Sequence, residues 1–600
     1  MGRLLNVEKQ NCSNSPVVIA CRKALVGVGI MKKLRESNTF WAAVSVLVSC
    51  GIICCFWKLY YAVVDDVFYR NVITGKYTGS IRPQGMMIKY PVTLMISLAS
   101  RLFFHIDIYG IFWVLSHFLC FFLITKCVLH RFPSNRISAL CMISIVFWVV
   151  DVPNIIYFQF TTTAALYAAT GVFLLLLGEQ KIRIYIVSLI MFTMSICIRK
   201  DTFIMVLPFI MLVWLLRLWE SYKSESNIGR EVKKCLLYLC ILGVLYGGIS
   251  VVDYLAGDKD AVHDEFRIHR TNVRDYDGVP DYDTYPQFYQ ELGEDGLART
   301  EYDLIRRQMV VWDYSADIHD IFKYMHGLNL ENRKRLEPKY KLIMAKTKFL
   351  TVWERVLVKP QIVIAGLTWI IIGICLLIKR KWVYLLFAIT GGFGIIGEAF
   401  VLLYRGRMPE RVMQSLMLTI VLFLFGMVVR LLLRDKSNED IGRKDRICFY
   451  VLGVAYVAVF FMLLLPGIQE KQAEYEKRYR KYTIIDEYCA EHPENIYFIT
   501  GDTGDTDRLG SKYDNSFVNY ISPKLNLGPS YYELLETAGI KGSAEEAVTT
   551  QANTYIIGIE ENADIIALDE YFAEKYKDAY SCEIVDQLED SFCVWKICVR

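Results

Sequence analysis

Long apolar runs recur along most of this chain and constrain its fold more than any other feature. The first run, from Trp41 to Asp66, holds roughly two dozen mostly apolar residues, enough as a helix to cross a hydrocarbon core about 30 Å thick. It is too long for the hydrophobic region of a signal peptide, and no small-residue cleavage site follows it. Hydrophobic residues make up 54% of the sequence, which excludes an ordinary soluble globular protein. The sequence therefore predicts a polytopic α-helical membrane protein that keeps its first span.

Ten further apolar runs are predicted to span the membrane, which gives about eleven spans in all. They cover residues 106–128, 137–152, 161–178, 184–198, 202–219, 235–256, 361–378, 382–404, 415–433 and 447–467. The piece from Tyr90 to Phe104 is short and contains Pro91 and Arg101, so it is predicted to lie along the membrane surface. With this topology, most loop Lys and Arg residues fall on the side of the basic N-terminal tail, which the positive-inside rule makes cytoplasmic.

The topology divides the chain into parts that alternate between membrane and water. They are a cytoplasmic tail at 1–40, a transmembrane core at 41–256 with a first outer loop at 65–105, an extracytoplasmic loop at 257–359, a second transmembrane core at 360–467 and an extracytoplasmic domain at 468–600. In the last part, helix-like stretches alternate with β-rich runs, which predicts a small α/β domain. The helix-like stretches are Glu470 to Tyr488 and Ala563 to Tyr576, and the β-rich runs are Asn495 to Thr500, Thr554 to Gly558 and Phe592 to Val599.

The first candidates for chemistry are Asp65 and Asp66, which end the first apolar run. Acidic residues at the C-terminal end of a helix oppose its dipole, so function explains the pair better than stability does. A carboxylate at the membrane interface is a suitable general base for activating a hydroxyl group. The alternative is a solvated helix end without a chemical role.

Two charged clusters are predicted on the same, outer side. Arg199, Lys200 and Asp201 form the tip of a tight hairpin, where they are either functional or an ordinary loop whose arginine reaches the headgroups. The second cluster runs from Tyr404 to Arg411. It contains Arg405, Arg407, Glu410 and Arg411, and Glu398 precedes it inside the apolar run.

Arginine suits a phosphate because its planar fork gives two charge-assisted hydrogen bonds and remains charged at any working pH. Phosphate binding is therefore favoured for the second cluster. The alternative is a salt-bridged cap in which Glu410 and Glu398 neutralise the arginines.

Other signals are weaker. The sequence has no metal-ligand spacing, Walker motif, GxSxG elbow or HExxH motif, and the net charge of +4 does not indicate nucleic acid. We predict no cofactor and no metal ligand, and the sequence leaves a requirement for a divalent cation open. The stretch from Gly501 to Asp507 is interpreted as a turn rather than a cation site. Four cysteines of the C-terminal part could pair in an oxidising space, namely Cys489, Cys582, Cys593 and Cys598.

The layout resembles the GT-C superfamily of integral-membrane glycosyltransferases, which includes protein O-mannosyltransferases and aminoarabinose transferases of lipid A. The likeness lies in the acidic pair after the first span, the first-loop residues Gly75-Lys76-Tyr77 and Tyr90-Pro91, the many spans and the C-terminal domain. It implies inverting transfer of a hexose or pentose from a polyprenyl-phosphate donor to a hydroxyl of a glycan, lipid or protein acceptor. The reaction would occur on the outer face of the cytoplasmic (plasma) membrane.

The resemblance also implies roles for residues. Either Asp65 or Asp66 would be the general base, with Asp66 slightly favoured. The charge argument adds Arg199, Lys200, Arg405, Arg407 and Arg411 as candidates for binding the donor phosphate.

Two other functions stay open. A flippase or transporter of lipid-linked saccharides would carry its charges near mid-membrane, on helices broken by Gly or Pro, where this chain offers Glu398 and Pro208. A polysaccharide polymerase or ligase would depend on outer arginines without a base at the end of the first span.

Overall fold

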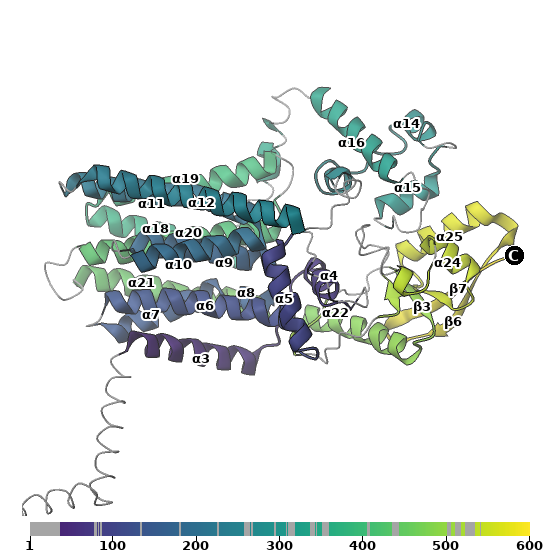
Figure 1. Cartoon of the computed structure of the whole chain (residues 1–600), viewed down its shortest axis with the longest axis horizontal. Helices are drawn as coiled ribbons and strands as arrows, with labels where there is room; N and C mark the ends of the chain where they lie inside the picture. Colours follow the sequence, from purple (N-terminus) through teal and green to yellow (C-terminus); the bar gives the residue numbers. More distant parts are fainter. Residues whose placement is uncertain are drawn as a thin grey trace, which may run out of the picture.

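The computed structural model describes residues 37–600 with gaps at 77–80, 82, 84–86, 133–134, 179–181, 225–226, 257–264, 266–267, 293–295, 308, 310–317, 336–341, 344, 351–358, 405–407, 435–442, 501–505, 511–517, 522–534 and 541. A bundle of long helices lies on one side and a smaller α/β domain on the other (Figure 1). One long helix, α22 (Leu465–Glu491), leads from the bundle into the α/β domain. The end of the bundle that faces this domain is called the domain end below.

In the described part of the chain, nine helices are long and apolar enough to cross a membrane, and two shorter apolar helices accompany them. The bundle helices are α3 (Asn38–Phe56), α6 (Ile108–Arg131), α7 (Arg136–Val150), α9 (Phe160–Leu177), α10 (Ile182–Ile198), α11 (Lys200–Lys223), α12 (Ile228–Ala256), α18 (Pro360–Ile378), α19 (Trp382–Tyr404), α20 (Glu410–Arg434) and α21 (Arg443–Val459). Each corresponds to one predicted span, so the prediction of a polytopic helical membrane protein is confirmed. Helix α5 (Tyr90–Leu102) lies at the domain end, where a surface helix was predicted (Figure 1).

Helix α9 is the centre of the bundle, because every one of its residues is buried. It packs against α6, α10, α11 and α20. Small residues allow these neighbours to approach closely, as is common between membrane helices. At Gly171, a Cβ atom would lie only 2.7 Å from the ring of Phe192 on α10.

Arginines from three neighbouring helices surround the C-terminal end of α9. Arg131 of α6, Arg217 of α11 and Arg430 of α20 donate hydrogen bonds to the backbone carbonyls of residues 175–178. The last carbonyls of a helix have no partner within it, and they form the negative end of its dipole. We call Arg131, Arg217 and Arg430 the arginine collar.

The α/β domain contains a five-stranded sheet in the order β4-β3-β5-β7-β6. Its strands are β3 (Ile496–Ile499), β4 (Tyr520–Ile521), β5 (Thr554–Ile559), β6 (Tyr580–Gln587) and β7 (Phe592–Val599). Strand β3 pairs in parallel with β4 and β5, while β7 runs antiparallel to β5 and β6. Helices α24 (Ala544–Thr550) and α25 (Ala563–Tyr576) belong to the same domain. The predicted small α/β domain is therefore confirmed.

The three β-rich runs of the sequence became β3, β5 and β7, whereas β4 and β6 were not predicted. Strand β6 is largely exposed and lacks a clear apolar alternation, and β4 is only two residues long. The four cysteines that were considered for pairing are all free thiols.

The α/β domain contacts the bundle through a segment that pairs with the chain after the first span. Strand β1 (Tyr60–Tyr61) pairs in parallel with β2 (Tyr157–Phe158). On its other side, the backbone N–H of Tyr61 donates to the carbonyl of Asp507 over 3.0 Å, and that of Leu509 donates to the carbonyl of Leu59 over 2.8 Å. Asp507 is thus part of an interface between the domain and the bundle, while residues 501–505 of the predicted turn lie outside the described residues.

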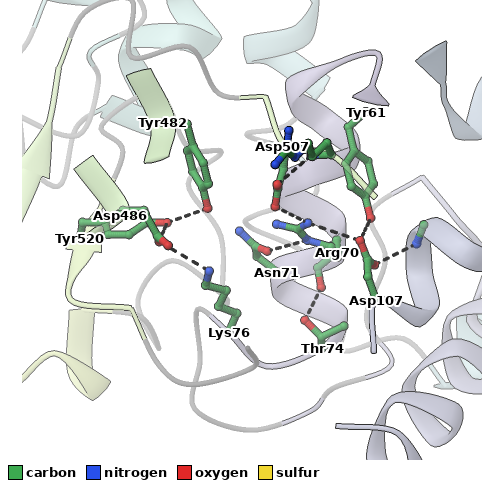
Figure 2. Close-up of polar contacts among 12 residues, drawn as sticks. Tyr61, Arg70, Asn71, Thr74, Lys76, Asp107, Tyr482, Asp486, Asp507 and Tyr520 are labelled. Atoms are coloured by element: carbon green, nitrogen blue, oxygen red, sulfur yellow. Dashed lines mark hydrogen bonds and ion pairs between the residues drawn. The ribbon is translucent and has the colours of Figure 1, made fainter. Parts of the chain in front are cut away.

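A buried ion cluster closes this interface (Figure 2). Arg70, which is fully buried, lies 2.6 Å from a carboxylate oxygen of Asp507 and 3.5 Å from one of Asp107. Asp107 also accepts a hydrogen bond from the hydroxyl of Tyr61 over 2.5 Å. Burying one charge is expensive unless opposite charges and hydrogen bonds compensate it, so the two carboxylates and Arg70 depend on one another.

We expect Asp507→Asn to lower the free energy of unfolding by about 3 kcal/mol, toward the lower end of the cost of breaking a buried ion pair because Asp107 remains. The matched control is Glu474→Gln, which removes an exposed pair with Arg478 on α22 and should change stability by less than about 1 kcal/mol. Thermal or denaturant unfolding of the purified chain in detergent measures both changes. Equal stability of the two variants would contradict the structural role of the cluster.

Candidate active site

The acidic pair lies on a separate short helix, α4 (Val64–Ile73), and not at the end of the first span. The prediction that the first span runs to Asp66 is wrong, because α3 ends at Phe56 and the chain then forms β1 before α4 begins. Aromatic residues that look apolar enough to continue the span pair with β2 instead. Asp65 and Asp66 thus occupy the first turn of a helix, where its dipole stabilises negative charge.

Asp66 is fully buried beneath the site. One of its carboxylate oxygens accepts hydrogen bonds from the hydroxyl of Tyr109 over 3.0 Å and from the backbone N–H of Phe160 over 3.3 Å. The other oxygen has no hydrogen-bond partner among the described residues. Burial raises the pKa of Asp66 well above its ordinary value of 3.8, and the negative charge of Asp65 acts in the same direction.

Asp65 has the opposite environment. Its side chain is 43% exposed, and a carboxylate oxygen lies 3.3 Å from the guanidinium of Arg411, at the start of α20. These two residues are 346 positions apart in the sequence. An accessible carboxylate can meet the hydroxyl of a substrate, and its contact with Arg411 fixes its orientation.

Arg199 completes the cluster from the start of α11. Its guanidinium donates to the hydroxyl of Thr161 over 2.8 Å and lies 5.5 Å from the centre of the Phe160 ring. Burial lowers the pKa of Arg199, the positive charge of Arg411 lowers it further, and the charge of Asp65 opposes both effects. Arg199, Arg411 and Asp65 therefore lie within electrostatic reach of one another.

The start of α9 connects the two halves of this site, because Phe160 binds Asp66 and Thr161 binds Arg199. Helices α6, α11, α18 and α20 begin at the same end of the bundle. Helix N-termini carry partial positive charge and unpaired N–H groups, so the domain end of the bundle favours anions.

A cavity of about 590 Å³, lined by both charged and apolar residues, opens beside Arg411. Lys359 and Lys471 also line it, and both form ion pairs with Glu410, at 2.8 Å and 4.0 Å. Glu410 thus neutralises lysines, whereas Arg411 faces Asp65. The alternative considered for this cluster was a cap in which Glu410 and Glu398 neutralise the arginines. In the described residues, Glu410 instead pairs with Lys359 and Lys471, and Arg411 pairs with Asp65.

The structure places the other predicted residues as follows. Lys200 and Asp201 are exposed in the first turn of α11, and the charge of Asp201 acts on the pKa of Arg199. Tyr404 is exposed at the end of α19. Glu398 is half-buried within α19, and one of its oxygens has no hydrogen-bond partner in the described chain. Arg405 and Arg407 lie outside the described residues.

Sequence reasoning missed several residues of the site. Lys359 and Lys471 flank spans, where a lysine is an unremarkable feature, and no signal marks them. Tyr109 was also missed, although it is a fully buried tyrosine whose hydroxyl needs a partner, which is Asp66. The described residues contain no cluster of three or more His, Cys, Asp or Glu side chains that could hold a metal ion.

Fold and site together define a multi-pass membrane protein with carboxylates and arginines gathered at the domain end of its bundle. No family model and no curated protein matches the sequence. Two solved structures of ArnT from Cupriavidus metallidurans are similar to it, one in the apo state with 10% identity and one bound to undecaprenyl phosphate with 11% identity. Each match has a TM-score of 0.36 and covers 93% of this chain and 98% of the other.

The raised pKa of Asp66 predicts a pH-dependent stability. The folded chain holds a proton that the unfolded chain releases near pH 3.8, so the free energy of unfolding falls as pH rises from there toward the folded pKa. Asp66→Asn keeps the acceptor oxygen and removes this titration. We therefore expect the unfolding temperature of the variant to increase relative to that of the wild type as the pH rises. Unfolding temperatures of both proteins, measured from acid to alkaline pH, check this. A pH-independent difference would show that Asp66 titrates normally.

Proposed function

We propose that the protein is a membrane glycosyltransferase that moves a sugar from a polyprenyl-phosphate donor to an acceptor hydroxyl. The observation that carries the proposal is the juxtaposition of Asp65 with Arg411, beside Arg199 and a cavity that Arg411 lines. An accessible base and fixed cations are the two elements that displacement of a phosphate by a hydroxyl requires. The resemblance of the sequence to GT-C enzymes points to the same reaction.

In the proposed reaction, the carboxylate of Asp65 accepts the proton of the acceptor hydroxyl. The hydroxyl oxygen forms a bond to the anomeric carbon while the bond from that carbon to the phosphate oxygen breaks. Polyprenyl phosphate leaves with the electron pair, and Arg199 and Arg411 stabilise the developing negative charge. A single displacement of this kind inverts the anomeric centre.

The two aspartates have different roles in this proposal. The sequence alone favoured Asp66 as the base, but its burial and its hydrogen bonds to Tyr109 and Phe160 suit a positioning residue. Asp65 is accessible, and Arg411 fixes its orientation. We therefore assign the general base to Asp65. The two neighbouring aspartates therefore differ in burial and in hydrogen-bond partners, and these differences separate their roles.

We propose that the reaction occurs on the extracytoplasmic face, a choice that the distribution of Lys and Arg among the loops supports. The apolar tail of the donor would remain in the membrane while its phosphate reaches the arginines. The acceptor is a hydroxyl of a glycan, lipid or protein.

We expect Asp65→Asn to reduce kcat for sugar transfer by about 10²- to 10⁴-fold, the usual contribution of a general base, with little change in donor binding. Arg411→Gln should instead weaken donor binding. Transfer from radiolabelled polyprenyl-phosphate sugars by the purified protein, with binding measured on the same samples, separates the two effects.

Asp578→Asn is the matched control, since Asp578 is an exposed carboxylate in the α/β domain. Full activity of Asp65→Asn would remove Asp65 from the mechanism. Movement of the lipid-linked sugar across vesicle membranes without transfer would instead identify a flippase. Transfer that needs the arginines but neither aspartate would favour a polymerase or ligase.

A further inference from the structure

The cavity at the candidate active site also contains neutral polar groups that have no role in the proposed reaction. Two side-chain amides line it: Gln159, the residue before α9, and Asn154, on the short helix α8 (Val152–Ile156). Gln159 immediately precedes the two residues of α9 that bind Asp66 and Arg199. The amides therefore belong to the same wall of the site as the groups that hold these two charges.

The two amides are only partly paired within the protein. Gln159 is 5% exposed, and its side-chain oxygen has no hydrogen-bond partner in the described chain. Asn154 is 7% exposed and donates one hydrogen bond to the carbonyl of Val150 over 3.1 Å, which leaves its side-chain oxygen available to a ligand. Burying an amide without a partner is costly, so a polar group of a ligand would compensate it.

The charged residues of the cavity, by contrast, have partners. Glu410 pairs with Lys359 and Lys471, and Arg411 pairs with Asp65. The groups of a ligand that the amides call for are therefore neutral. Hydroxyl groups suit amides, because one hydroxyl can donate to an amide oxygen and accept from an amide nitrogen.

We propose that this cavity binds the transferred sugar, and that Gln159 and Asn154 select the sugar through hydrogen bonds with its hydroxyl groups. This proposal rests on the proposed function, because it takes the ligand to be the sugar of the polyprenyl-phosphate donor. The volume of about 590 Å³ lies within the common range for ligand sites, about 300–1,000 Å³. A site built to bind a hydroxyl rejects an analogue without it, because the polar groups of the site are then left unpaired.

Lipid binding to the purified full chain tests the proposal without turnover. The probes are polyprenyl phosphate and polyprenyl-phosphate glucose, mannose and arabinose. We expect at least one sugar-bearing lipid to bind about tenfold more tightly than polyprenyl phosphate, the effect of about one hydrogen bond. Gln159→Leu and Asn154→Leu should each remove most of this difference and leave the affinity for polyprenyl phosphate unchanged, a selectivity that a general loss of folding would not produce.

Gln159→Leu is the cleaner variant, because the hydrogen bonds that Gln159 accepts from Thr162 and Thr163 are made to its backbone carbonyl. Gln287→Leu is the matched control, since Gln287 is exposed on α14 (Pro286–Gln290) and does not line the cavity. With the preferred sugar, the wild type should bind one deoxy analogue about tenfold less tightly, whereas Gln159→Leu should bind both alike.

The outcomes separate this proposal from the proposed function. If none of the lipids binds, the proposed function fails, and this proposal fails with it. If the lipids bind and both variants keep the preference for the sugar, only the assignment of Gln159 and Asn154 is overturned. Equal affinity of the wild type for polyprenyl phosphate and for every sugar-bearing lipid would also overturn it.

Discussion

The buried charge of Arg70 is the constraint on which the geometry of the candidate active site depends. Arg70 lies one turn after Asp66 on α4, and its guanidinium contacts a carboxylate of α6 and another from the α/β domain. A charge buried this deeply fixes the positions of its partners, because any separation leaves it uncompensated. The orientation of α4 is therefore set by contacts with two other parts of the chain, and the α/β domain is part of what holds the acidic pair in place.

The start of α9 has a comparable role inside the bundle. It gives a backbone N–H to Asp66 and a hydroxyl to Arg199, so one helix end orients both an acidic and a basic residue of the site. Because α9 is buried along its whole length, this end has little freedom to move. Catalytic groups held by rigid elements retain the close geometry that chemistry requires.

The sequence predicted the parts of the fold that rest on long, uniform patterns. Each predicted span corresponds to an apolar helix of the described chain, nine of them long enough to cross a membrane, because apolar runs of this length form a uniform pattern. Strands β1 and β2 have two residues each and continue or adjoin such runs, so they were not predicted. The site was predicted in outline: Asp65, Asp66, Arg199 and Arg411 were selected because charges at those positions are hard to explain as solvated surface, and the structure brings them together. The sequence could not predict that Asp66 is buried and Asp65 accessible, since this difference depends on Tyr109 and on the start of α9. The ion pair between Arg70 and Asp507 was not predicted either. Asp507 was interpreted as part of a turn, and no sequence pattern connects it with Arg70.

The arginine collar has a consequence for how this protein can vary between relatives. Its contacts with the end of α9 are made to backbone carbonyls, which every amino acid supplies, while Arg217 also donates to the hydroxyl of Tyr185 and Arg430 to the carboxylate of Glu220. One apolar residue can therefore replace another in the last turn of α9 without loss of these hydrogen bonds. Arg131, Arg217 and Arg430 cannot be replaced in this way, because each must reach the carbonyls with its guanidinium. In a set of diverged sequences, we expect the three arginines to be kept while the residues at the end of α9 change. Covariation alone would then fail to reveal the contact between the arginines and α9.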